Sequence, residues 1–348
     1  LLVHPGKYFS NIFVSDYPNG YAGMFSSMDS YWNDLNGNIL IKLVSVFDIF
    51  SCGNYYINSL FFNFIVFFGH VFLYKLFITI YTDRKKLAIM GCFLLPSPLY
   101  FCSGMHKDGI VFLMLAILIY CVHQSLQQNK ITKKYLVFIL ISLFFLLLIR
   151  NYVFIALVPA LAAWVLCKKI NQPAIFVFSG VYTLMIILLF TVNLVFNKVK
   201  PLDAIIAKQT SFLQLDTANT QIKLTPLQPT IKSFVTNAPE ALNHLLLRPY
   251  LWELPVITLL PLNIELALYQ LLLLSFIFLK RKNRVVKHYP LLYFILFFIF
   301  SVFLLTGYIV PNLGSIVRYR SIYLPLLITP VLCMIDWERL ARFLKIIK

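Results

Sequence analysis

The chain has 348 residues, of which 60% are hydrophobic and 12% charged, with a formal net charge of +17. A soluble domain has about 25% charged residues, so this composition predicts an integral membrane protein. The positive charge does not indicate a nucleic-acid partner, because the lysines and arginines flank apolar stretches, where they act as topology signals.

Nine apolar stretches are expected to be transmembrane helices, since a helix of about 20 residues crosses a bilayer. They lie at about 56–81, 87–102, 109–126, 135–149, 152–167, 174–197, 254–279, 288–309 and 321–336. The predicted fold class is therefore all-α: a polytopic transmembrane helix bundle with external loops and an interfacial helix, one membrane domain over residues 1–348. Residues 4–40 already have the composition of an external loop, so one more span is expected upstream.

The basic residues alternate along the chain as the positive-inside rule describes. Every second connection is basic, beginning with Arg84, Lys85 and Lys86 and continuing through Lys133 and Lys168. This pattern predicts a multi-pass protein of the bacterial inner membrane with those connections in the cytoplasm. Most acidic residues then fall on the external, periplasmic side, where any chemistry is expected.

Two segments are predicted to lie outside the membrane on the external side. The first, residues 4–50, contains helix-breaking glycines and prolines and ends in an amphipathic stretch at 39–50 that suits a helix lying in the interface. The second, residues 198–253, is the largest non-apolar segment and is expected to be a loop with short helices that covers a site.

The first external loop carries three carboxylates, Asp16, Asp29 and Asp34. They are the candidate catalytic residues, since a group transfer needs a base beside the attacking hydroxyl or carboxylates that hold a divalent cation. The alternative is that these residues form turns and helix caps. A divalent cation is compatible with this site but not required, and no metal-ligating set is predicted.

A second cluster lies in the short connection at 103–109, where His106, Lys107 and Asp108 are consecutive. Charged groups at the mouth of an apolar bundle are costly and point to function. The alternative is a solvated turn in which Asp108 caps the following helix.

Cations expected on the external side complete the candidate binding site for a phosphate: Arg150, Arg248, Arg318 and Arg320, with Glu253 beside them. Arginine binds phosphate through two parallel charge-assisted hydrogen bonds. Because positions i and i+2 of a helix diverge, only one residue of the pair at 318 and 320 is expected to face the site. Lipid-interface snorkelling is the alternative for that pair, and a mutual ion pair is the alternative for Arg248 and Glu253.

The order of these features resembles the bacterial polytopic glycan-assembly proteins related to the GT-C membrane glycosyltransferases. The most specific parts of the resemblance are Ser-Gly-Met-His-Lys-Asp at 103–108 and Gly-Ser-Ile-Val-Arg-Tyr-Arg at 314–320. The resemblance implies an enzyme that transfers a sugar from a polyprenyl-phosphate carrier to a cell-envelope glycan acceptor on the external face. It also implies that a first-loop acid, Asp16 or else Asp29, is the base and that the later arginines hold the carrier phosphate.

Two other functions are compatible with the sequence. A polysaccharide polymerase of the O-antigen or exopolysaccharide type would transfer whole repeat units at a site led by arginine and histidine. A non-enzymatic transporter of lipid-linked glycans would place ionisable groups deep inside the spans, where Glu265 is the main example. No P-loop, GxSxG or HExxH motif is present, so an ATPase, a serine hydrolase or a zincin is not expected.

Overall fold

The computed structural model describes residues 4–11, 17, 20–21, 23–24, 30–195, 200–214, 220–250, 253, 260–280 and 289–343. Its regular secondary structure in these ranges is helical, which confirms the predicted all-α fold class. Two isolated antiparallel bridges, Gln221 with Asn312 and Lys280 with Ile335, join segments far apart in the sequence. The catalytic candidates Asp16 and Asp29 lie outside the described residues.

Among the described residues, five helices are long and apolar enough to cross a membrane: α3 (Tyr55–Ile80), α6 (Lys107–Gln127), α9 (Ala174–Val195), α12 (Leu260–Leu279) and α13 (Tyr289–Ile309). Two bent pairs bring this number to seven: α4 (Lys85–Phe93) with α5 (Pro96–Ser103), and α14 (Leu313–Ser321) with α15 (Leu324–Met334). The shorter apolar helices α7 (Lys133–Ile149) and α8 (Asn151–Leu166) occupy the remaining two predicted stretches. The helices are thus consistent with about nine spans.

The stretches at 87–102 and 321–336 were each predicted as one span, and the structure divides each of them into two helices. The first bends by 44° between α4 and α5, and the second bends by 62° between α14 and α15. A proline lies in the first turn of the second helix of each pair, Pro96 and Pro325. Proline has no N–H and disfavours helical geometry at the preceding residue, so a helix begins again there.

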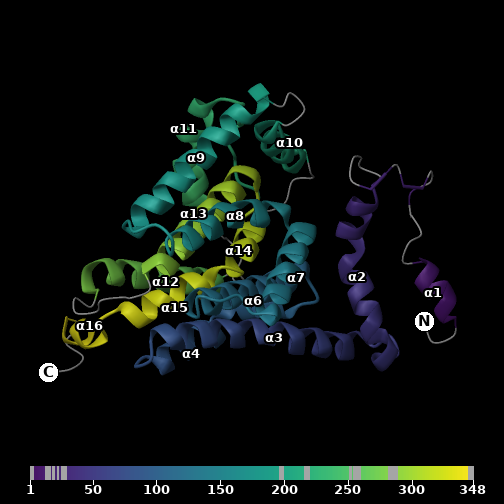
Figure 1. Ribbon diagram of the computed structural model, residues 1–348, viewed down its shortest axis with the longest axis horizontal. Coiled ribbons are helices and arrows are strands. Elements are labelled where there is room, and N and C mark those ends of the chain that lie inside the picture. The colour runs from purple at the N-terminus through teal and green to yellow at the C-terminus, as the bar shows by residue number, and fades with distance from the viewer. Residues whose placement is uncertain are drawn as a thin grey trace.

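Helix α6 forms the centre of the bundle and packs between α3 and α7 (Figure 1). In an apolar stretch of 18 residues within α6, 78% of the residues are buried, whereas in the corresponding stretch of α9 only 11% are buried. The first turn of α6, which carries Asp108, is therefore in the middle of one end of the bundle.

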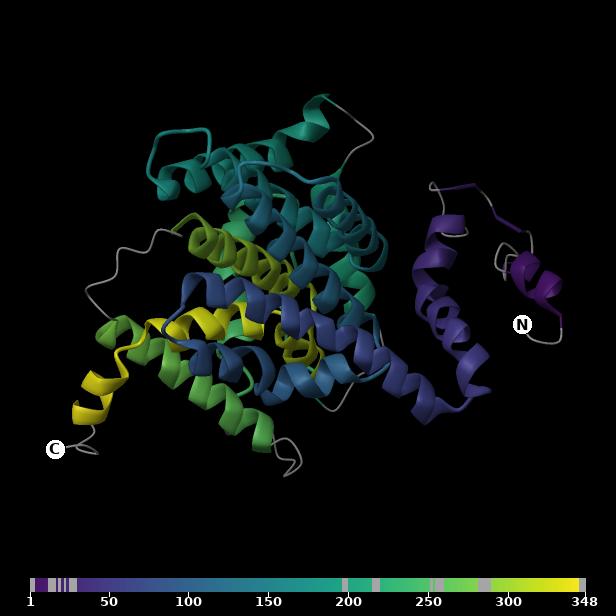
Figure 2. The same cartoon turned by 60° about the horizontal axis from the view of Figure 1, so that its bottom comes forward.

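Helix α2 (Tyr31–Ser51) is longer than the amphipathic stretch predicted at 39–50. It begins after Ser30, whose hydroxyl accepts a hydrogen bond from the Asn33 N–H, and it continues through Gly37, which was wrongly expected to break a helix. Figure 1 and Figure 2 show α2 running across one end of α3, with α1 (Pro5–Asn11) beyond it and α16 (Trp337–Phe343) at the other end of the bundle.

The segment at 198–253 contains two helices, α10 (Pro201–Leu213) and α11 (Ile231–Leu246). Helix α11 packs closely on α13 at Gly307. A Cβ atom added to Gly307 would lie only 2.1 Å from the backbone oxygen of Ala241. This contact leaves no room for any side chain at position 307.

Replacing Gly307 by alanine is therefore expected to destabilise the protein by about 2 kcal/mol, because the added methyl group must push α11 away from α13. The measurement is the thermal unfolding midpoint in detergent. Gly180→Ala is the matched control, since nothing lies within 4 Å of a Cβ atom at that helical position, and a Gly→Ala change in an open helix is neutral or stabilising. Equal midpoints for the two variants would show that the α11–α13 contact is not tight.

Candidate functional site

A buried carboxylate lies at the tip of the α5–α6 hairpin. Asp108 is in the first turn of α6, where the helix dipole favours a negative charge, and it is fully buried. The hairpin is tight because Gly109 lets the two helices approach: a Cβ atom there would be 2.6 Å from the Cys102 carbonyl oxygen. Asp108 is thus fixed inside the bundle and not in a solvated turn.

Two arginines from distant segments share this carboxylate. Arg150, at the junction of α7 and α8, donates from Nη2 to Oδ1, and Arg318, in α14, donates from Nε to Oδ2. A buried charge is tolerated when it is paired and hydrogen-bonded, so both oxygens of Asp108 are engaged. Asp108 therefore positions the two guanidinium groups and is not a free proton acceptor in this arrangement.

The two arginines differ in how much they are held. Arg150 also donates to the Tyr152 hydroxyl at 2.7 Å, lies 4.3 Å from the centroid of the Tyr319 ring, and has only 11% of its side chain exposed. The side chain of Arg318 is 37% exposed, and Asp108 is its one hydrogen-bond partner within the described residues. Arg318 is consequently the arginine whose remaining N–H groups are accessible to a ligand.

Lys107 and helix α2 complete the cluster on its outer side. The Lys107 ammonium donates to the Asn36 carbonyl oxygen at 2.5 Å, and the Asn36 side chain donates to the Leu148 carbonyl oxygen at the end of α7. Helix α2 is thereby fixed over the hairpin tip. Lys107, Arg150 and Arg318 face one carboxylate, Asp108, so these four side chains carry a net charge of +2. His106 is exposed next to them at the N-cap position of α6. We call Lys107, Asp108, Arg150 and Arg318 the Asp108 cluster.

Two buried polar atoms near this cluster have no hydrogen-bond partner among the described residues. They are the Nε of Arg150 and the hydroxyl of Tyr323, a residue in the break between α14 and α15. Tyr323 lies within electrostatic range of both Arg150 and Asp108. Buried polar groups are normally satisfied, so the interior side of the Asp108 cluster has two polar groups that the described residues leave without a partner.

The third predicted catalytic carboxylate, Asp34, is described but does not join the Asp108 cluster. It is buried in the first turn of α2, where it accepts from the Tyr21 hydroxyl at 3.1 Å and from Asn38 at 2.8 Å. Lys42 lies 3.7 Å away. These contacts fit the structural alternative, in which Asp34 stabilises the beginning of α2.

Arg320 points away from Arg318, as expected for residues two apart on a helix. Its Nη1 donates to the carbonyl oxygens of Leu245 and Arg248 at 3.0 and 2.8 Å, and its side chain is buried. A cation at the carboxyl end of a helix is favoured by the helix dipole. Arg320 therefore holds the end of α11 and is not part of the Asp108 cluster.

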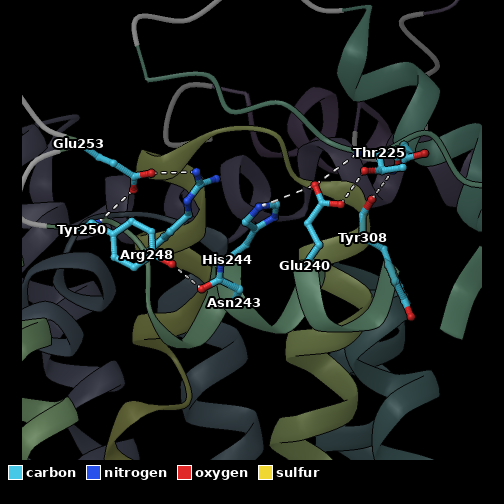
Figure 3. Close-up of polar contacts among 9 residues, drawn as sticks. Thr225, Glu240, Asn243, His244, Arg248, Tyr250, Glu253 and Tyr308 are labelled. Atoms are coloured by element: carbon cyan, nitrogen blue, oxygen red, sulfur yellow. Dashed lines mark hydrogen bonds and ion pairs between the residues drawn. The ribbon is translucent and has the colours of Figure 1, made fainter. Parts of the chain in front are cut away.

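Arg248 and Glu253 form a separate cluster after α11 (Figure 3). Their side chains pair at 2.8 Å, and Glu253 also accepts from the Tyr250 N–H at 3.0 Å. On α11 itself, His244 Nε2 is 4.0 Å from Glu240. Burial lowers the pKa of His244, and the Arg248 guanidinium lowers it further, which favours the neutral imidazole. The ion pair between Arg248 and Glu253 matches the structural alternative that was named for them, and their role in binding stays a prediction.

The surroundings of Glu265 were not predicted from the sequence. Its carboxylate accepts from the backbone N–H of Ser97 at 3.0 and 3.1 Å, from the Ser97 hydroxyl and from the Tyr269 hydroxyl. Helix α5 has no side-chain cap of its own at Leu95, so Glu265 from α12 satisfies its first turn at the break. An acidic residue in an apolar span, together with Pro96 in another span, was the available signal.

No group of three or more histidine, cysteine or acidic side chains suited to a metal ion occurs within the described ranges. No protein-family model, curated protein or solved structure matches the chain. A function must therefore be inferred from the Asp108 cluster itself.

Proposed function

We propose that the protein is a membrane glycosyltransferase that takes a glycosyl group from a polyprenyl-phosphate carrier and transfers it to a cell-envelope glycan acceptor. The observation that carries this proposal is Arg318, a partly exposed arginine fixed by a fully buried carboxylate at the end of an apolar bundle. A lipid phosphate needs both features: cationic donors at the membrane boundary and apolar surface for its chain.

Each member of the Asp108 cluster has a role in this proposal. Arg318 binds the carrier phosphate with its outer N–H groups, Lys107 adds a second cation, and Asp108 and Arg150 hold Arg318 in place. When the acceptor oxygen attacks the anomeric carbon, the bond to the phosphate oxygen breaks and the carrier phosphate leaves with the electron pair. The cations stabilise that developing charge, and Asp16 or Asp29 takes the acceptor proton.

One observation favours a second candidate, a polymerase that transfers whole lipid-linked repeat units. The Asp108 cluster is led by arginines, with His106 exposed beside it, and Asp34 is engaged within α2. This is the arrangement expected for a polymerase. Both candidates use the same phosphate site and differ in which glycan is attached to the carrier.

The test is the surface-glycan profile of a host that lacks the gene and is complemented with variants matched for membrane expression. Arg318→Gln is expected to abolish complementation, and Arg318→Lys to restore only part of it, because lysine keeps the charge but not the bidentate geometry. Lys223→Gln, an exposed cation beyond α10, is the matched control and should complement fully. A glycan shortened by one sugar indicates the transferase, whereas single unpolymerised repeat units indicate the polymerase. Full complementation by Arg318→Gln would refute both.

A further inference from the structure

A second charged site lies at the end of the bundle where α3 leads into α4. A cavity of about 620 Å³ is lined by residues 82–87 and by Trp337 of α16. We call it the basic cavity. Its volume is in the range of about 300–1,000 Å³ that is typical of small-ligand sites, and it is separate from the Asp108 cluster, which lies at the other end of α3 and α6.

The charges that line the basic cavity are unbalanced. Among its described lining residues, Arg84, Lys85 and Lys86 face one acid, Asp83, whose carboxylate is 3.9 Å from Arg84. Lys85 and Lys86 are exposed and occupy the first turn of α4, where the helix dipole disfavours positive charge. An anion in the cavity would offset this repulsion.

The other features of the basic cavity point to a lipid. Trp337 is held by a hydrogen bond of 2.9 Å from its indole N–H to the Leu332 carbonyl oxygen, and tryptophan is enriched at the level of the lipid headgroups. One turn further along α4, the exposed residues Ile89 and Met90 follow Lys85 and Lys86 on the same faces of the helix. A lipid bound here would place its headgroup against the cations and its acyl chains against the apolar surface.

We propose that the basic cavity binds the phosphate headgroup of an anionic phospholipid, with its acyl chains along the exposed apolar face of α4. Lys85 and Lys86 provide the charge, Arg84 adds directed hydrogen bonds, and Trp337 forms the apolar wall. This inference does not depend on the proposed glycosyl transfer, because no residue is shared between the two sites.

The test is native mass spectrometry of the detergent-purified protein titrated with phosphatidylglycerol or phosphatidylcholine. Wild type should bind phosphatidylglycerol selectively, and Lys85→Gln with Lys86→Gln should weaken that binding about 25-fold, since each lysine near a membrane surface contributes about a fivefold factor. The variant Lys85→Arg with Lys86→Arg should keep it, which separates loss of charge from misfolding.

The matched control is Lys133→Gln with Lys134→Gln. These lysines are the first two residues of α7, as Lys85 and Lys86 are of α4. At α7, however, the Thr132 hydroxyl caps the helix by accepting a hydrogen bond from the Tyr135 N–H. The control should leave phosphatidylglycerol binding within about twofold of wild type. Equal losses in the two double variants, equal binding of phosphatidylcholine, or complete displacement of the lipid by millimolar inorganic phosphate would each overturn the proposal.

Discussion

Replacing Asp108 by alanine is expected to destabilise the protein at the Asp108 cluster and to abolish glycan assembly. The change removes the one carboxylate that separates Arg150 from Arg318 and leaves a largely buried guanidinium without its counter-charge. Removing one partner of a buried ion pair costs about 3–5 kcal/mol. The thermal midpoint of the purified variant in detergent and the glycan profile of the complemented host measure the two effects.

A double-variant cycle separates the charge from the shape of this cluster. Asp108→Asn keeps the volume of the side chain, and combining it with Arg318→Gln removes one charge of each sign. We expect the double variant to be more stable than the sum of the single effects predicts, by at least about 1 kcal/mol, yet to remain without function. Additive losses, or a stable Asp108→Ala protein, would show that the two arginines do not depend on Asp108.

The second large effect is expected for Glu265→Ala. This change leaves the Ser97 N–H and the Tyr269 hydroxyl buried without an acceptor, at about 1–3 kcal/mol for each group. It also removes the carboxylate within electrostatic range of the buried Arg320. A loss of about 3–5 kcal/mol in the free energy of unfolding is expected, measured by the unfolding midpoint in detergent.

Glu265→Gln distinguishes the two contributions, because the amide oxygen still accepts from Ser97 while the charge opposite Arg320 is lost. The glutamine variant should lie between wild type and alanine. If Glu265→Ala is as stable as wild type, the break between α4 and α5 does not need a cap from α12, and the account of that broken helix is wrong.

The helices could largely be predicted from the sequence, because bilayer thickness fixes the length of an apolar span and short basic connections mark its ends. The two broken helices were missed because an apolar stretch that contains one or two prolines has nearly the same composition as a continuous apolar helix. Pro96 and Pro325 were the available signals. Helix α2 was predicted too short because Ser30, which caps it, lies in a segment rich in turn residues.

The composition of the site could be predicted but its pairing could not. His106, Lys107 and Asp108 were selected together as the titratable groups of one hairpin tip, and Arg318 was selected as an external cation. The divergence of Arg318 from Arg320 follows from helix geometry. That Arg150 and Arg318 share one carboxylate depends on how α7 packs against α6 and α14 against α5, since Arg318 and Asp108 are 210 residues apart. Spacing along a chain contains no information about such contacts.

Binding of polyprenyl phosphate to the purified protein in detergent, where transport has no meaning, tests the central claim most directly. Wild type and Lys223→Gln are predicted to bind it saturably with the same affinity, and Arg318→Gln to bind it at least about tenfold more weakly, since a hydrogen bond to a charged group contributes about 1.5–3 kcal/mol. Equal affinity in wild type and Arg318→Gln would contradict the assignment of the Asp108 cluster as the carrier-phosphate site.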